Sequence, residues 1–307
     1  PFDIKGYLFL VLALASLQLT LDRGEIEGWF DSNYIVITTS AVVLGLYFFI
    51  THSLTTNNRF ISPEIFKDKN LMLGIVFQFI LGFLVLSMNV IMPLFMQNLR
   101  EFPIMMAAMV MMPRGIGTLV GLVVAGRLSN RVDPRAVIIF GFLCVAFSAW
   151  RLSNFTVDVG IWDFIIAAFF NGIGIGAIWV PLTAVSFWTL PAKFRTEAST
   201  FTTLFRNYGS GIGVSVVICI LSRSQTTAHR YLSERINPYS EAMKSYLLPE
   251  QWNFSSVDGL RLIDNEIARQ AMSIGFFNDF YFIMIGALAS IPLAMLLSRG
   301  DKKIRLS

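Results

Sequence analysis

The chain has 307 residues, of which 55% are hydrophobic and only 14% are charged. Soluble domains carry about a quarter charged residues, so this composition excludes a soluble domain and indicates a protein that crosses the membrane several times. The net charge of +4 is spread over several short loops. The sequence therefore offers no concentrated basic surface for nucleic acid.

Apolar runs long enough to cross about 30 Å of hydrocarbon alternate with polar loops along the whole chain. Their length fits helices and not the shorter alternating strands of a barrel. The sequence therefore predicts an all-α polytopic membrane protein with eight transmembrane helices, at residues 6–21, 34–50, 71–95, 104–125, 136–150, 161–182, 200–221 and 272–297.

The eight predicted spans divide into a hairpin of two and a bundle of six. Within the bundle, a polar outer loop separates the last two spans, and part of it has the apolar spacing of an amphipathic helix, at residues 257–271. The predicted units are an extra hairpin at 1–53, a cytoplasmic linker at 54–70, a six-helix transporter bundle at 71–298 with its outer loop at 223–271, and a basic tail at 299–307.

Basic residues gather at one end of the predicted spans, in the linker, the loop at 126–135, the loop at 191–197 and the tail. Cytoplasmic loops carry an excess of Lys and Arg, so both ends of this segment are predicted to be cytoplasmic, in the plasma (inner) membrane. Anionic lipid is the expected electrostatic partner. The chain begins with Pro1 and not Met, which predicts a longer protein continuing upstream.

The loop at 126–135 has the sequence GRLSNRVDPR and separates the fourth and fifth spans. Asp133 followed by proline is typical of a helix N-cap and first turn, and Gly126 would allow a tight exit from the preceding span. The arginines could hold neighbouring helix ends in a gate, or they could serve topology alone. The candidate gating residues are Gly126, Arg127, Arg131, Asp133 and Arg135.

Three ionisable residues fall inside apolar spans, where each is a functional candidate because burying it in lipid is costly. Arg114 and Arg206 are predicted near the middle of the membrane, and Asp279 about 10 Å below the outer end of the last span. We predict that Arg206 lines the transport cavity or pairs with Asp279, and that protonation of a carboxylate would loosen such a pair. A static ion pair between the last two spans is the alternative.

On the third span, polar and small residues recur at helical spacing and share one face that is predicted to look inward. With amides, hydroxyls and aromatics of later spans, it would form a wall suited to amphipathic ligands. Interhelical hydrogen bonding is the alternative for the amides. The predicted substrate-binding residues are Gln78, Asn89, Arg114, Asn171, Trp179, Thr183, Arg206, Asn207 and Tyr208.

Glycines four residues apart recur within the spans and predict close helix packing, at Gly117/Gly121, Gly172/Gly176 and Gly209/Gly213. Enzyme chemistry finds no support, because no nucleophile has a base partner in sequence and the two histidines fall on opposite sides of the membrane. Asp22, Glu25 and Glu27 are interpreted as a solvated outer turn. We predict no catalytic residues, no metal site and no cofactor.

Six segments carry a family resemblance: SLQLTLDRGEIEGWF at 16–30, PLFMQ at 93–97, the loop at 126–135, NGIGIGAIWVPLT at 171–183, RNYGSGIG at 206–213 and FNDF at 277–280. Together they resemble the C-terminal part of fourteen-span drug:proton antiporters of the EmrB/QacA type, within the major facilitator superfamily. Asn130 and Asp133 depart from the superfamily loop, which commonly has Asp and Gly there, so the charge arrangement of the loop is altered.

The resemblance implies a secondary active transporter that exports amphipathic drugs by alternating access, driven by the proton gradient. The chain would hold the extra helix pair and the second bundle. Its partners would be a drug-like substrate, protons, the bilayer and the missing N-terminal six-helix bundle, with a periplasmic adaptor protein left open. The alternatives are an exporter of a metabolite or siderophore on the same fold, and a non-transporting membrane scaffold or intramembrane enzyme.

Overall fold

The computed structural model describes residues 3–56, 65, 67–129, 131–155, 160–236 and 256–297. Within these ranges it contains eight helices long and apolar enough to cross a membrane, which confirms the predicted all-helical fold. They are α1 (Ile4–Gly24), α2 (Asn33–Thr55), α3 (Lys69–Asn98), α4 (Ile104–Leu128), α5 (Pro134–Ser153), α6 (Ile161–Phe187), α7 (Arg195–Arg235) and α9 (Val257–Met295). Short 3-10 turns, η1 (Trp29–Asp31) and η3 (Ala192–Phe194), precede α2 and α7.

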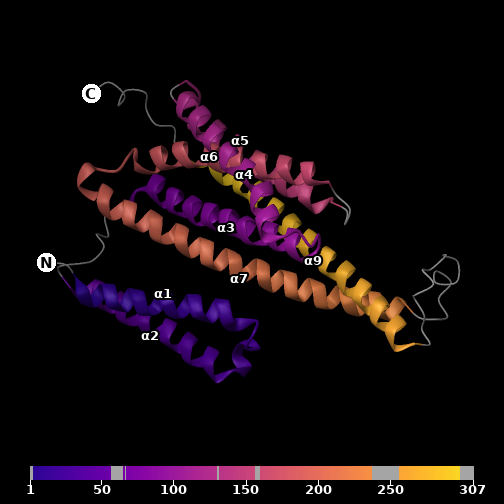
Figure 1. Cartoon of the computed structure of the whole chain (residues 1–307). Coiled ribbons are helices and arrows are strands. Elements are labelled where there is room, and N and C mark those ends of the chain that lie inside the picture. Colours follow the sequence, from indigo (N-terminus) through magenta and orange to yellow (C-terminus); the bar gives the residue numbers. More distant parts are fainter. Residues whose placement is uncertain are drawn as a thin grey trace.

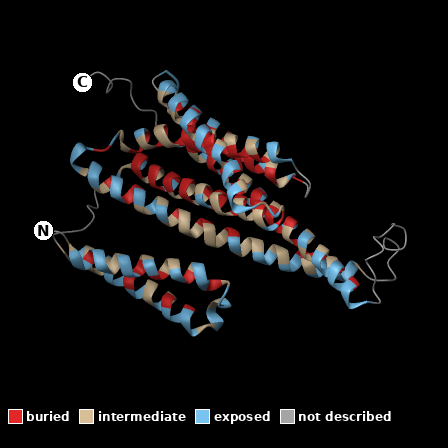
Figure 2. Ribbon diagram, viewed as in Figure 1, coloured by how far each residue is buried: buried red, intermediate tan, exposed pale blue. Residues whose placement is uncertain are grey.

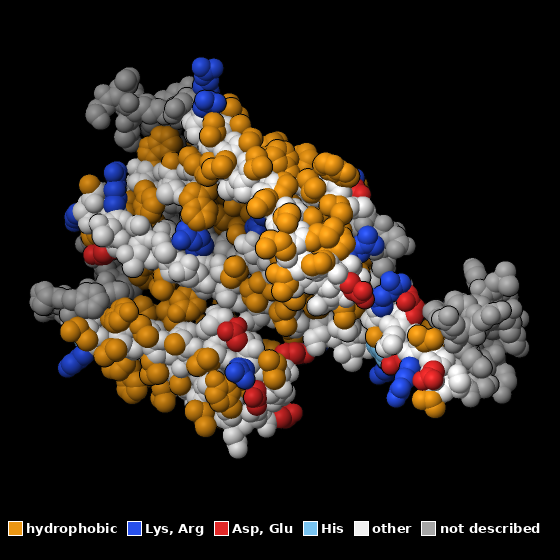
Figure 3. Space-filling view, viewed as in Figure 1, with side chains coloured by type: hydrophobic (Ala, Val, Ile, Leu, Met, Phe, Trp, Pro, Cys, Tyr) orange, Lys and Arg blue, Asp and Glu red, His pale blue; other side chains and the backbone are white. Residues whose placement is uncertain are grey.

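The helices form a six-membered bundle and a separate hairpin (Figure 1). In the bundle α6 packs between α4 and α5, α3 packs along α7, and α9 contacts α5, α7 and α3. The hairpin of α1 and α2 touches the bundle through α7. Buried residues concentrate in the bundle, whereas the hairpin is mostly exposed (Figure 2). Hydrophobic side chains cover much of the visible surface, as a lipid-facing protein requires (Figure 3).

The predicted outer loop at 223–271 is wrong at both of its ends. Helix α7 runs for 41 residues and ends at Arg235, and α9 begins at Val257 and runs for 39 residues. The predicted amphipathic segment at 257–271 is helical, but it continues into the last span and packs its Ile263 and Ile267 into the protein. The middle of this loop, the tail and most of the linker lie outside the described residues.

Side-chain caps start several helices, and one of them is the cap that the sequence predicts at Asp133. Asp133 accepts a hydrogen bond from the Arg135 N–H, and proline occupies the first turn of α5, which confirms that N-cap. The predicted exit at Gly126 is wrong, because α4 continues through Gly126 and ends at Leu128. The apolar residues around this glycine keep the backbone helical while it is still at membrane depth.

The glycine pairs hold the bundle helices in direct backbone contact, as predicted. A Cβ atom added to Gly172 would meet the carbonyl oxygen of Arg114, and one added to Gly176 would meet that of Thr118, so α6 and α4 touch along this seam. Gly209 lies in the same way against the backbone of Phe79, joining α7 to α3. Apolar surface gains little by helix association in lipid, so such close van der Waals contact is a main source of stability there.

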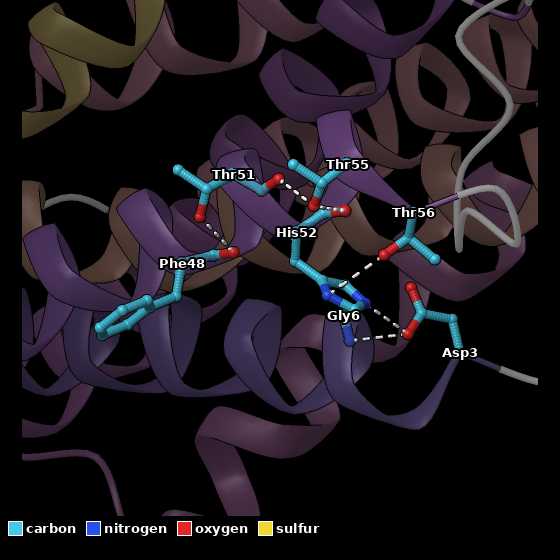
Figure 4. Close-up of polar contacts among 7 residues, drawn as sticks. All are labelled: Asp3, Gly6, Phe48, Thr51, His52, Thr55 and Thr56. Carbon is cyan, nitrogen blue, oxygen red and sulfur yellow. Dashed lines mark hydrogen bonds and ion pairs between the residues drawn. The ribbon is translucent and has the colours of Figure 1, made fainter.

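The hairpin closes on itself with its own contacts. Gly45 of α2 packs against the backbone of Ala13 on α1. At the end opposite the η1 turn, Asp3 Oδ1 accepts a hydrogen bond from the Gly6 N–H at 3.0 Å and lies 2.9 Å from His52 Nε2 (Figure 4). The cap of α1 therefore also ties the last turn of α2 to it.

Polar side chains join the end of the hairpin near the η1 turn to α7. Ser215 donates a hydrogen bond to Asp22 at 2.5 Å. The guanidinium of Arg223 donates to both carboxylate oxygens of Glu25, at 3.1 and 3.0 Å, and the Cys219 thiol donates to the same carboxylate at 3.2 Å. The interpretation of this turn as merely solvated is wrong for Asp22 and Glu25, because α7 extends past the apolar run and presents partners to them.

The Glu25 carboxylate is held firmly in its charged form. The hydrogen bonds from Arg223, and after them those from the Trp29 indole and the Cys219 thiol, lower its pKa from 4.5 to about 2. Because charge-assisted hydrogen bonds favour the ionised carboxylate, the contact persists through the physiological pH range.

Candidate functional site

The centre of the candidate site is a contact between α7 and α6. The guanidinium of Arg206 lies over the ring of Trp179, 4.7 Å from its centroid. Arg206 is eleven residues into α7, about 16 Å from its first residue, and therefore deep within the span. A cation over an aromatic face gains electrostatic attraction but keeps its charge, and no carboxylate of the described chain forms an ion pair with it. The guanidinium therefore remains able to bind an anionic or polar group.

Arg114 forms a second cationic position in the bundle, on α4. Its side chain is buried, and its Nη2 donates a long hydrogen bond of 3.4 Å to the carbonyl oxygen of Val85 on α3. The Arg114 backbone lies against Gly172 of α6. One backbone carbonyl only partly satisfies five guanidinium donors, so Arg114 also keeps hydrogen-bonding capacity inside the bundle.

The polar face predicted on α3 does point inward. Gln78, Gly82 and Met92 are buried, and Val85 and Asn89 are half-buried. The middle of this face is filled by α7, because Gly82 lies against the Arg206 backbone. The Gln78 side-chain oxygen is buried without a hydrogen-bond partner.

The remaining predicted binding residues separate into two groups. Asn171 on α6 is buried, and its side-chain oxygen has no hydrogen-bond partner. Thr183 is half-buried and donates its hydroxyl to the carbonyl of Trp179, on its own helix. Asn207 is exposed, and Tyr208 lines an apolar cavity against the hairpin. Asn207 and Tyr208 therefore do not join the group around Arg206.

The predicted ion pair between Arg206 and Asp279 is absent. Asp279 is fully buried, and neither carboxylate oxygen has a hydrogen-bond partner. Gly275, one turn before it, packs against Leu221, which lies fifteen residues beyond Arg206 on α7, about 22 Å along the helix. Because α7 is a long continuous helix, the two charges lie at different depths.

The described residues of the predicted gating loop lie at and between the ends of α4 and α5. Arg127 and Arg131 are exposed. Arg135 is half-buried, and its Nε is shielded without a partner. Asn130 lies outside the described residues. Gating by this loop stays a prediction.

Sequence reasoning missed one buried side-chain oxygen of the bundle that has no hydrogen-bond partner. The Ser87 hydroxyl on α3 is fully buried without a hydrogen-bond partner, close to Gly213 of α7. Ser87 lies three residues before Val90 and interrupts an otherwise apolar face of α3. This interruption was the only feature of the sequence that could have indicated a buried polar group here. With Gln78, Asn171 and Asp279, Ser87 gives the bundle four buried polar side chains that have an unsatisfied oxygen.

Comparison with known proteins shows which family the chain belongs to. Residues 9–214 match the Major Facilitator Superfamily. The chain belongs to this family. The match covers about two thirds of the chain, from the hairpin to the middle of α7, and so includes the Arg206–Trp179 contact.

Two curated superfamily members are similar over nearly the whole chain. The probable multidrug resistance protein EmrY of Escherichia coli (strain K12) is 29% identical over 96% of this chain and 57% of its own length. The multidrug export protein EmrB of Haemophilus influenzae is 26% identical over 94% of this chain and 57% of its own. The chain therefore spans a little over half the length of these relatives.

A solved structure with the same fold is the crystal structure of a bacterial homologue of the human lysosomal transporter Spinster, in an inward-facing and occupied conformation. It aligns over 98% of this chain and 67% of its own, with a TM-score of 0.55 and 16% sequence identity. At this identity the likeness shows the superfamily fold alone.

Proposed function

We propose that the chain is the C-terminal part of a proton-driven multidrug efflux transporter that exports amphipathic compounds by alternating access. Its membership of the superfamily and the names of its relatives support this reading. The observation that carries it is the Arg206 guanidinium, held over Trp179 deep in the span with no carboxylate partner in the described chain. A flat cation beside an aromatic ring suits a ligand with both a polar group and an apolar body.

Completing such a transporter would require a second six-helix bundle, which we place N-terminal to this chain; that the chain spans only 57% of the length of two relatives supports this part of the proposal. Helix α4 supports this part of the proposal. Beyond its contacts with α6 it presents a wide exposed apolar face, with Met105, Met109, Met112 and Ile116 at helical spacing. The missing bundle would cover this face, and flexible methionines suit a surface that repacks during transport. Cytoplasmic ends for this segment follow from the basic loops.

Proton coupling is assigned to Asp279. Its carboxylate is fully buried in α9 and has no hydrogen-bond partner. A charge without a partner is costly within a membrane span, so taking up and releasing a proton is the change of state that this position favours. Arg206 contacts the substrate in this scheme and Asp279 exchanges the proton, at separate depths.

The direct test is dye efflux from cells that express the complete reading frame with Arg206→Ala. We expect efflux that requires the proton gradient to fall to background while the inserted protein remains at its normal level. Arg206→Lys keeps the charge but loses the planar stacking and should retain part of the activity. Arg230→Ala, on an exposed turn of the same helix, is the matched control. Full efflux by Arg206→Ala at normal protein level would contradict the assignment, and efflux that survives an uncoupler would contradict the proton drive.

A further inference from the structure

A cavity of about 430 Å³ separates the hairpin from the bundle. Its walls are apolar side chains of α1 and α2 on one side and of α7 and α3 on the other, including Leu10, Leu14 and Leu17 facing Phe201, Phe205 and Ile212. The Tyr208 hydroxyl is the single polar group among the lining side chains. This cavity is distinct from the Arg206–Trp179 contact, which lies on another side of α7.

The hairpin contacts the bundle at both ends of the cavity. At one end, Phe49 of α2 packs against the apolar cluster that contains Leu71 and Phe201. At the other end the contacts with α7 are polar, from Gln18 against Gly211 to Glu25 with Arg223. Below these contacts, large aromatic side chains such as Phe201 and Phe205 occupy the wall of α7. No glycine seam draws the helices together there, so the space needs an occupant in the membrane.

The cavity is elongated along the membrane normal. From Phe201 to Ile212 it follows α7 for eleven residues, about 16 Å, roughly half of the 30 Å hydrocarbon core. Its lower end begins about 9 Å from the first residue of α7 and of α1. Several lining residues, among them Leu46 and Ile50 of α2 and Phe205, are more than a third exposed. The cavity is therefore open sideways, and hydrocarbon can reach it from one leaflet.

Three exposed cations stand at the helix ends below the cavity: Lys5 in the first turn of α1, Lys193 in η3 and Arg195 at the start of α7. These ends lie at headgroup depth, where basic side chains attract anionic lipid. We propose that the cavity binds one acyl chain of an anionic phospholipid, with the headgroup beside these cations. Figure 3 shows hydrophobic side chains on both sides of the boundary between the hairpin and the bundle, where the acyl chain would lie. The lipid would complete the packing between hairpin and bundle.

The inference does not depend on which compound is exported, so it can be tested without transport. The complete protein is reconstituted in nanodiscs with phosphatidylglycerol carrying a diazirine on its acyl chain, illuminated, and mapped by peptide mass spectrometry. We expect labelling to concentrate on the α7 segment 201–212 and on α1 between Leu10 and Leu17. Labelling spread evenly over the lipid-facing helices would overturn the proposal.

Filling the cavity supplies the decisive comparison. Leu14→Trp should reduce labelling of α7 several-fold, whereas Leu12→Trp, at a lipid-exposed position of the same helix, should leave it unchanged. Ile212→Phe fills the cavity from the opposite wall if Leu14→Trp does not fold. Equal labelling of filled and control variants would refute the site.

Two further experiments test the role of the lipid headgroup and whether the acyl chain belongs to a phospholipid or to a free fatty acid. Replacing Lys5 and Arg195 together by glutamine should remove the preference for phosphatidylglycerol over phosphatidylcholine. Diazirine palmitate serves as the free fatty acid. If palmitate labels the cavity and neither phospholipid does, the occupant is a free fatty acid and the phospholipid assignment is wrong.

Discussion

The six-helix bundle and the two-helix hairpin are joined to their neighbours by different means. In the bundle, glycines such as Gly172 and Gly209 bring backbones into contact. Between the hairpin and α7, hydrogen-bonded side chains join the η1 end of the hairpin to α7, and an apolar cavity remains on the side away from that end. Lipid tails compete with every loose apolar contact. The bundle should therefore behave as a rigid unit, and the hairpin as a unit that can be detached from it.

The same two regions treat polar groups differently. In the bundle Gln78, Asn171 and Asp279 are buried with unpartnered oxygens. At the junction with α7, Asp22 and Glu25 each accept several hydrogen bonds. A buried polar group without a partner costs free energy. Polar residues at the junction therefore serve structure, and those in the bundle are the better candidates for transport.

The largest effect should come from breaking a bundle seam. Gly172→Val would drive a side chain into the backbone of α4 at Arg114 and Thr118, and overpacking costs about 1–3 kcal/mol even where neighbours can shift. We expect loss of monodisperse protein after extraction and a lower Tm. Gly115→Val on α4 is the control, because nothing lies within 4 Å of its added Cβ. Equal behaviour of the two variants would show that the seam is not tight.

The second-largest effect is expected from Asp279→Asn, which should change transport but not stability. Asp279→Asn keeps the size of the side chain but cannot exchange a proton, so gradient-driven efflux should fall to background while substrate exchange across proteoliposomes persists. Asp264→Asn, at an exposed position of the same helix, should change neither. If Asp279→Asn abolished exchange and lowered Tm as well, Asp279 would be structural, and the contrast between regions would weaken.

A smaller effect should follow from loosening the junction. Glu25→Gln weakens the contact to Arg223. Hydrogen exchange in the C-terminal half of α1 should then accelerate by up to roughly fivefold, on the scale of partly exposed ion pairs, while exchange in α6 stays constant. Glu27→Gln is the control, because Glu27 bonds Ser32 within the hairpin turn. Acceleration in α6 would mean that the hairpin and bundle are not separate units.

The junction should also respond to acid in a defined window. The pKa of Glu25 is lowered from 4.5 to about 2, so the unfolded chain binds the proton more readily than the folded one. The contribution of Glu25 to stability is therefore complete above pH 4.5 and is lost as pH falls toward 2. The protection factors of the α1 amides, which correct for the intrinsic pH dependence of exchange, should fall between pH 6 and 3 in the wild type and stay constant in Glu25→Gln.

The smallest effect is expected where an ion pair is open to solvent. Arg151 and Asp163 join the adjoining ends of α5 and α6, and each side chain is about a third exposed. Such pairs contribute about 0.2–1 kcal/mol. A double-mutant cycle with Arg151→Gln and Asp163→Asn should give a coupling energy in that range. A coupling energy above that range would show that this pair stabilises the bundle more than a solvent-exposed ion pair does.

Much of the fold could be predicted because bilayer thickness and hydropathy act locally. Eight spans, the Asp133 cap and the glycine pairs all follow from residues a few positions apart. The outer loop could not be placed, because α7 and α9 continue as polar helices to Arg235 and from Val257. Their mutual packing, and not hydropathy, keeps those turns helical.

The candidate site was predicted as a set of residue types but not as a set of contacts. Arg206 and Trp179 were both identified, and only the tertiary structure reveals that their side chains meet. The predicted pair of Arg206 with Asp279 was wrong, because depth in separate spans cannot be compared from sequence to within a few turns, and the Asp279 carboxylate has no hydrogen-bond partner. Tyr208 was placed beside Arg206 but lines the cavity against the hairpin.

By itself the sequence determined the membrane-spanning helical architecture, its division into a hairpin and a bundle, and the ionisable residues inside the spans. These depend on the composition of single segments, which the bilayer selects one at a time. Only the tertiary structure decided which polar groups are paired, which are left without partners, and where the hairpin meets α7. Those outcomes depend on the rotation and depth of one helix against another, which packing between distant segments sets.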